Sequence, residues 1–239
     1  MSVVVVVPAY NASHFVREVL ERISSASLPD LTRIVVVNDG SVDATGAEVA
    51  RARVRCPVER IDRSHNGGYG AAMKDGLARA GAWDPEIVAC IHADGQYSPE
   101  VLPDLVADMR ARGLDILQGS RIASGTALSG GMPIYKYVAN AILNRVENHA
   151  LGLSMTDYHS GYLLYGRRAL RSLPFAGLSD SFDFDLEVIA SARAHGLLVS
   201  EAPVPTHYGA EVSHLRPIAY GMRVLRVLWN YRRGRYAPA

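Results

Sequence analysis

Cysteine is scarce in this sequence of 239 residues, which contains only Cys56 and Cys90. Two cysteines are too few for a disulfide framework, and Cys90 lies inside an apolar run typical of a buried strand. The composition therefore argues against a disulfide-stabilised secreted domain. A reducing cytoplasm is the expected location.

Long apolar runs and an excess of one charge are also missing. The N-terminal run 3–7 is short and has no basic leader, whereas a membrane span needs roughly 20 apolar residues. Lysine and arginine number 25, and aspartate and glutamate number 24, which gives a formal charge of +1. We therefore expect a chain that does not cross a membrane by itself and has no nucleic-acid partner.

Apolar strands and amphipathic helices alternate through the first half. The run 3–7 does not alternate in polarity, so a strand there must be buried on both faces, as in a parallel sheet. Further strands are expected at 34–37, 58–61, 87–91 and 115–118, and helices at 41–52, 70–80 and 99–112. Asn11 or Ser13 would cap an additional first helix with Phe15 on its apolar face. The pattern predicts an α/β fold with a doubly wound, mostly parallel sheet that has helices on both faces.

The second half is less regular. Residues 122–132 are rich in glycine, serine, threonine and alanine and are typical of a loop. A helix is expected at 133–151, ended by Gly152, followed by a strand at 161–165, a helix at 184–195 and a strand at 198–203. The basic amphipathic tail 222–236 would by default pack as an ordinary helix; contact with an anionic membrane surface or a homodimer face are the alternatives.

The strongest functional pattern follows the strand 87–91. His92, Asp94 and Gln96 alternate along an extended segment, so their side chains point to one side. Ligands of open α/β sheets bind at the carboxyl ends of the strands, where these residues lie. A hard cation prefers the oxygens of Asp94 and Gln96, whereas His92 suits Mn²⁺ better than Mg²⁺ or contacts phosphate directly. The segment predicts a metal-bound diphosphate site.

Two other strand ends offer groups for a nucleoside. Tyr10, after Pro8, can present a ring face to a base, and Asp39 can accept hydrogen bonds from base or ribose. Alternatively, Asp39 and Ser41 cap the next helix. The glycine-rich turn 66–70 precedes a helix, where free amides favour an anion, although such a turn is more often only a tight loop.

Seven short motifs carry a resemblance to a known family. They are Val7–Asn11, Val37–Ser41, Asn66–Gly76, His92–Gln96, Gly119–Arg121, Met132–Lys136 and Thr156–Gly161. In this order and spacing they resemble glycosyltransferase family 2, the inverting GT-A enzymes, and within it the dolichyl- or polyprenyl-phosphate mannose and glucose synthase-like group. The resemblance implies one GT-A domain over 1–239, with a nucleotide-sugar-binding half to residue 121, an acceptor-binding half at 122–215 and the basic helix at 216–239.

The resemblance also implies a reaction and a donor site. A hexose would pass from a UDP- or GDP-sugar to a polyprenyl phosphate at the cytoplasmic, inner membrane face, with the enzyme attached peripherally. The family usually holds Mg²⁺ or Mn²⁺ with an acid-any-acid motif, which implies Asp94, Gln96 and His92 as metal ligands. The nucleotide-binding residues it implies are Pro8, Tyr10, Asn11, Asp39, Asn66, Gly70, His92, Ala93 and Asp94.

The acceptor decides which residues do the chemistry. A lipid phosphate is already an anion and needs cationic positioning, which the resemblance assigns to Arg121 and Lys136; Arg121 could instead pair with a surface acid. A hydroxyl of a soluble metabolite or glycan needs a general base, for which Asp157, Asp183 and Asp185 are candidates. Acids in a first helical turn more commonly complement the helix dipole.

Three histidines and a binding-only function complete the alternatives. His159, His207 and His214 lie near motif positions, but a histidine is more often an ordinary hydrogen-bonding residue than a ligand. Lipid-phosphate relatives often carry an arginine and a lysine after the last strand, where this chain has His207 and His214. Because His92 alters the metal motif, a nucleotide-sugar-binding module without turnover is the third functional hypothesis.

Overall fold

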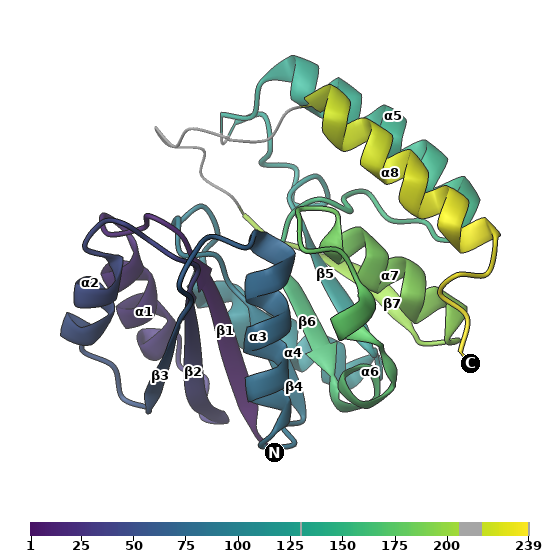
Figure 1. Cartoon of the computed structure of the whole chain (residues 1–239). Helices are drawn as coiled ribbons and strands as arrows, with labels where there is room; N and C mark the ends of the chain where they lie inside the picture. Colours follow the sequence, from purple (N-terminus) through teal and green to yellow (C-terminus); the bar gives the residue numbers. More distant parts are fainter. Residues whose placement is uncertain (130, 206–216, 239) are drawn as a thin grey trace.

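The computed structural model describes residues 1–129, 131–205 and 217–238, and the side chains of Lys136 and of residues 217–219 are outside that description. Seven strands form one sheet in the order β3-β2-β1-β4-β6-β5-β7 (Figure 1). Their bounds are β1 Val3–Ala9, β2 Leu31–Asn38, β3 Val58–Asp62, β4 Ile87–Cys90, β5 Ile116–Ser120, β6 Leu163–Gly166 and β7 Val199–Pro203. Only β6 is antiparallel to its neighbours. The mostly parallel, doubly wound sheet is confirmed.

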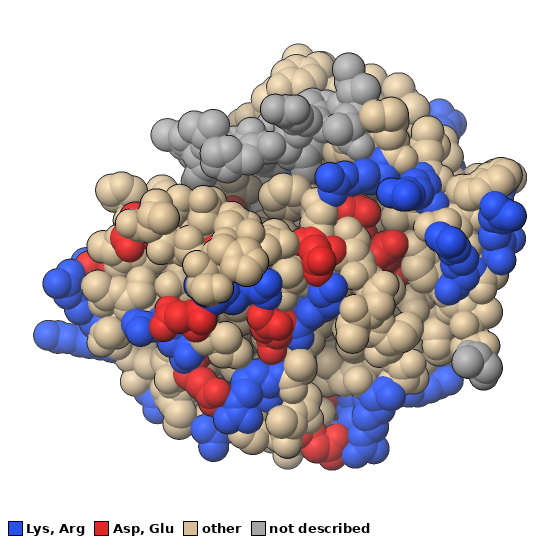
Figure 2. All heavy atoms as spheres, viewed as in Figure 1, with Lys and Arg blue, Asp and Glu red and all other residues tan. Residues whose placement is uncertain are grey.

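Helices cover both faces of this sheet. Their bounds are α1 Val16–Ser25, α2 Thr45–Arg51, α3 Tyr69–Gly81, η1 Pro99–Val101, α4 Leu102–Ala111, α5 Ile134–Leu151, α6 Arg167–Ser172, η2 Phe175–Gly177, α7 Phe184–Ala194 and α8 Pro217–Arg232. The valines of β1 are buried on both sides, as expected: Val4 and Val6 join a core with α3, α7 and α8, and Val5 joins a second core with α1 and α4. Acidic and basic side chains are interspersed over much of the face in Figure 2.

The predicted start of the first helix is wrong. Neither Asn11 nor Ser13 caps α1, which begins at Val16 with Phe15 at the N-cap and no side-chain cap. Asn11 has a positive φ of 49°, and its Oδ1 accepts a hydrogen bond from the Val42 amide at 3.0 Å. The local polar groups therefore join two loops at the sheet edge, and Phe15 is 41% exposed instead of core.

In the described residues, the second half follows the predicted order with two additions, the short helix α6 and the 3-10 helix η2. Gly152 ends α5 in the left-handed conformation, with φ 64°. Helix α8 packs beside α5 and buries Val224 and Val227, so the default expectation of an ordinary packed helix is confirmed for its inner face (Figure 1). In the ranges that the structure describes, no helix combines the length and the apolar character of a membrane span.

Candidate active site

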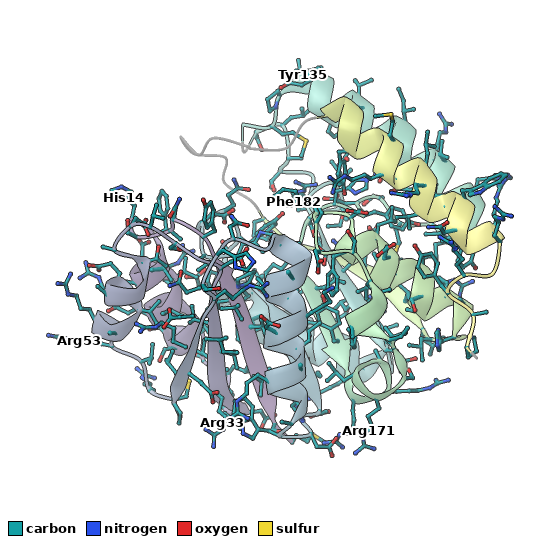
Figure 3. All side chains as sticks on the ribbon, viewed as in Figure 1. His14, Arg33, Arg53, Tyr135, Arg171 and Phe182 are labelled. Carbon is teal, nitrogen blue, oxygen red and sulfur yellow. The ribbon has the colours of Figure 1, made fainter. Side chains whose placement is uncertain are left out.

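The candidate site lies at the carboxyl ends of β1, β2, β4 and β5. Because β4 and β5 are both antiparallel to β6, they run in the same direction, and their ends meet at one edge of the sheet. This edge receives Tyr10, Asp39, His92 and Arg121 from four strands that are far apart in sequence. Figure 3 labels Phe182 here, whose ring stacks on Tyr69 at 6.1 Å between centroids.

Asp39 holds the glycine-rich turn. Its side chain is buried and accepts hydrogen bonds from the amides of Gly67 at 2.9 Å and Gly68 at 3.0 Å, and Arg63 Nε lies 2.9 Å from the same carboxylate. The alternative in which Asp39 and Ser41 cap the next helix is wrong, because α2 begins only at Thr45. A role of Asp39 toward a nucleoside stays a prediction.

The glycine-rich turn serves close packing. Gly68 has a φ of 97°, and a Cβ there would overlap the carbonyl of Asp180; a Cβ on Gly70 would overlap that of Ser179. Asn66 Oδ1 accepts a second bond from the Gly68 amide at 2.9 Å. The amides of Gly67 and Gly68 are thus already paired inside the protein. This pairing agrees with the tight-loop alternative, and a role of Asn66 and Gly70 near the donor's nucleotide stays a prediction.

Tyr10 is the open group of the predicted nucleoside site. It follows β1, which contains Pro8, and its side chain is exposed at the strand end. Beside it, the Asn11 amide donates to Ser41 Oγ at 2.9 Å, which ties the segment to the loop after β2. The ring of Tyr10 is therefore accessible for stacking on a base.

His92 makes edge-to-face contacts with two aromatic rings, and one of its ring nitrogens is buried. Its ring lies 5.1 Å from that of Tyr69 and 5.9 Å from that of Tyr97, and its Nε2 is shielded without a hydrogen-bond partner. A Cβ on Gly161 would overlap this ring. Burial lowers the pKa of His92; Asp94 partly opposes the shift and Arg121 adds to it. The imidazole is therefore neutral at pH 7, with Nδ1 as the nitrogen left for a metal or a phosphate.

Asp94 and Gln96 offer the oxygen atoms of the segment. The backbone N–H of Gln96 donates to Asp94 Oδ1 at 3.0 Å, and Gly95 between them has a positive φ of 74°. The side chains of Asp94 and Gln96 are partly exposed. Among the described residues, no three histidine, cysteine, aspartate or glutamate side chains cluster as metal ligands. Two oxygen donors nevertheless fit a divalent cation that takes its other ligands from a diphosphate and water.

Arg121 makes a buried ion pair with Asp157. Its Nε and Nη2 lie 2.7 and 2.9 Å from the two carboxylate oxygens, and its backbone amide donates to Oδ2 at 3.2 Å. Burial alone would raise the pKa of Asp157, but the charge and hydrogen bonds of Arg121 outweigh it and hold this pKa below its usual value. The partner of Arg121 is a buried acid, contrary to the surface-acid alternative. A depressed pKa makes Asp157 a poor base.

Asp185 has the opposite environment. It is buried at the start of α7, and both of its oxygens accept a hydrogen bond from the Tyr69 hydroxyl, at 3.0 and 3.1 Å. Burial raises the pKa of Asp185 to about 7, although Tyr69 and His159 oppose the shift. Asp185 lies in the first turn of α7, as the helix-dipole explanation expected, but its buried contact with Tyr69 gives it a second interaction. Asp183 instead accepts a bond from Ser179 Oγ at 2.9 Å.

Several predicted residues are not placed by the structure. Lys136 lies in α5, but its side chain is outside the described part of the chain, and His207 and His214 are outside it entirely. His159 is inside the protein, and its Nδ1 lies 2.8 Å from the Tyr220 hydroxyl, as in an ordinary hydrogen-bonding histidine.

Sequence reasoning missed Glu201. This β7 residue accepts bonds from the Thr156 amide at 2.7 Å and Thr156 Oγ1 at 2.9 Å and so holds the segment that carries Asp157. Only the pairing of β7 beside β5 brings it there, and no sequence signal marks it.

Comparisons with known proteins place the chain in a family. Residues 4–173 match the model of glycosyl transferase family 2. An uncharacterized protein of Methanocaldococcus jannaschii is 31% identical over 85% of this chain and 81% of its own length. The polyprenol monophosphomannose synthase of Mycolicibacterium smegmatis is 28% identical over 84% of this chain and 75% of its own.

The fold is likewise that of a solved relative. The glucosyl-3-phosphoglycerate synthase of Mycobacterium tuberculosis, in complex with Mn²⁺, UDP and glucosyl-3-phosphoglycerate, superposes with a TM-score of 0.71 at 17% identity, over 100% of this chain and 81% of that one. The GT-A fold implied by the motifs is confirmed. The chain is a glycosyltransferase and belongs to glycosyl transferase family 2.

Proposed function

We propose that this enzyme transfers a hexose from a UDP- or GDP-sugar to a polyprenyl phosphate, at the cytoplasmic face of a membrane. The observation that carries the proposal is the pair of Arg121 and Asp157 at the carboxyl edge of the sheet. Asp157 holds the Arg121 guanidinium in place and has too low a pKa to act as a base. Such a site suits an acceptor that is already an anion. The polyprenyl-phosphate sugar transferases among the relatives support it.

The chain's residues divide the work between leaving group and nucleophile. Asp94 and Gln96 would hold a divalent cation, Mn²⁺ or Mg²⁺, which when bound offsets the charge of the leaving nucleotide diphosphate. Tyr10 would stack on the base. Arg121 and Lys136 would align the acceptor phosphate, so that one of its oxygens attacks the anomeric carbon in line as the bond to the diphosphate breaks. One displacement inverts the anomeric configuration, and no proton has to be removed.

A radiolabelled transfer assay with short-chain polyprenyl phosphate, UDP- and GDP-sugars and Mn²⁺ tests the proposal. We expect a lipid-linked monosaccharide from the parent, a loss of product in Asp94→Ala, and a large loss in Arg121→Lys, which keeps the charge but not the two-point pairing. Arg112→Lys, in an exposed pair with Asp108, is the matched control. Donor turnover onto water-soluble acceptors without lipid product would contradict the proposal.

The second candidate is transfer to a hydroxyl with Asp185 as base. The supporting observation is the pKa of Asp185, about 7, which suits proton abstraction near neutral pH. Under this alternative, Asp185→Asn abolishes turnover on a soluble acceptor while donor binding persists. Under the lipid-phosphate proposal, the same variant keeps transfer, because no base is needed. Donor binding without any product in the parent would instead favour the binding-only hypothesis.

The metal proposal has a separate readout. Mn²⁺ binding in the presence of UDP, followed by electron paramagnetic resonance, should weaken in Asp94→Asn and less in His92→Ala, since a hard cation prefers an anionic oxygen to a neutral imidazole nitrogen. Identical activity with Mg²⁺, Mn²⁺ and excess chelator would contradict a metal role.

A further inference from the structure

Helices α5 and α8 present apolar side chains outward. On α5, Ile134, Val138, Ile142 and Val146 recur every four residues and are 41–73% exposed; on α8, Met222, Leu225 and Trp229 are 55–62% exposed. The two helices lie side by side over one end of the sheet, and Tyr135 lies at the outer end of α5 (Figures 1 and 3). We call this set of residues the α5–α8 face. Each helix contributes one stripe of exposed apolar side chains. Scattered exposed residues would not form such stripes.

The charge around the α5–α8 face has one sign. Arg226 and Arg232 on α8 and Arg233 directly after it are exposed, and among the described residues none of them has an acidic partner. The sequence of α8 contains no acid, and the one acid of α5, Glu147, is fully buried. Arg233 lies 5.7 Å from the ring centroid of Trp229. Figure 2 shows basic side chains along the region of α8.

We propose that the α5–α8 face docks on an anionic lipid bilayer. Apolar side chains would enter the boundary between headgroups and acyl chains, Trp229 and Tyr135 would sit at headgroup depth, and the arginines would meet lipid phosphates. A second copy of the chain fits less well. A two-fold dimer would place this face against itself, so the arginine rims would approach each other with no exposed acid on either helix to pair with them.

Buried polar contacts join the docking face to the acceptor side of the site. From α5, Asn140 donates to Asp157 at 3.4 Å, and Glu147 lies 3.2 Å from His159 Nε2. From α8, the Tyr220 hydroxyl lies 2.8 Å from His159 Nδ1. A bilayer that fixes the two helices therefore also fixes the segment that holds Arg121. This consequence rests on the proposed function, whereas bilayer binding itself does not.

Co-sedimentation with vesicles that contain no polyprenyl phosphate tests binding apart from catalysis. The full chain should bind vesicles of phosphatidylcholine with phosphatidylglycerol, and bind pure phosphatidylcholine far more weakly. Arg226→Glu with Arg233→Glu should lower the partition coefficient by roughly 20-fold or more. Arg53→Glu with Arg55→Glu makes the same charge change at exposed sites beyond α2 and should not. Equal losses in the two double variants would overturn the proposal.

A matched pair of leucines tests the apolar stripe. Leu225→Glu, on the face, should abolish vesicle binding, whereas Leu198→Glu, equally exposed at 53% against 55% but outside the face, should keep it. In a Trp83→Phe background, Trp229 is the single tryptophan, and its emission should shift to the blue with anionic vesicles. No shift, or a concentration-dependent dimer that Leu225→Glu disperses without any vesicle binding, would overturn the proposal in favour of a protein interface.

Discussion

The donor and acceptor sides of the site are built differently. On the donor side, Asp94 and Gln96 follow one strand closely, and their mutual contact spans two residues. On the acceptor side, Arg121 depends on Asp157, and that segment depends in turn on Glu201, in pairings that span 36 and 45 residues. We infer that Asp94 can be replaced with little effect on stability, whereas Arg121, Asp157 and Glu201 hold the structure together.

The largest expected loss of stability follows a substitution on the acceptor side. Asp157→Ala removes the buried carboxylate that Nε and Nη2 of Arg121 contact and should lower the free energy of unfolding by about 3 kcal/mol. Urea denaturation measures it, with Asp108→Ala in an exposed pair with Arg112 as control, expected at about 1 kcal/mol or less. A loss in Asp157→Ala no larger than in the control would remove the contrast between the two sides.

The next effect couples the two sides at the His92 ring. Gly161→Ala should lower the free energy of unfolding by about 2 kcal/mol or more, because φ is +75° and the new Cβ overlaps His92. In a His92→Ala background the overlap disappears and only the backbone strain, of order 1 kcal/mol, should remain. A double-mutant cycle by thermal or urea unfolding measures the difference. Additive effects would show that the ring does not depend on Gly161.

A third effect has the opposite sign and depends on pH. The folded pKa of Asp185, about 7, lies above the ordinary value of 3.8, so the folded state keeps a proton that the unfolded state releases. Asp185 therefore lowers the free energy of unfolding progressively as pH rises from about 4 toward 7, and it has no such effect below about pH 4. Asp185→Asn should match the parent near pH 4 and be more stable by roughly 2 kcal/mol near pH 5.5. Urea unfolding across this range measures it, and a pH-independent difference would contradict the shift.

The smallest effect on stability is on the donor side. Asp94→Asn keeps the turn with Gln96 and should change the free energy of unfolding by less than about 0.5 kcal/mol. The same variant should lose most Mn²⁺-dependent binding of UDP, measured by calorimetry. A large destabilisation without any change in metal binding would show that Asp94 is structural, and the two sides would then be alike.

Local sequence patterns predicted most of the helices and strands. The non-alternating valines of β1 predicted a buried parallel strand, and Gly152 predicted the end of α5, because each depends on residues close in sequence. The start of α1 could not be predicted. Asn11 had a helix-capping pattern, but its polar groups find partners at Ser41 and Val42, about 30 residues away. The same holds for Asp39, which reaches across to the glycine turn.

The sequence by itself determined the family, the sheet and the position of the candidate site, because strand periodicity and motif order are written along the chain. Only the tertiary structure decided how each polar residue is used. Asp157 and Asp185 are the same residue type, yet Arg121 lowers the pKa of Asp157 and burial raises the pKa of Asp185. Which side of α5 faces outward was likewise set by packing. These outcomes depend on burial and long-range partners, which strand periodicity and motif spacing do not encode.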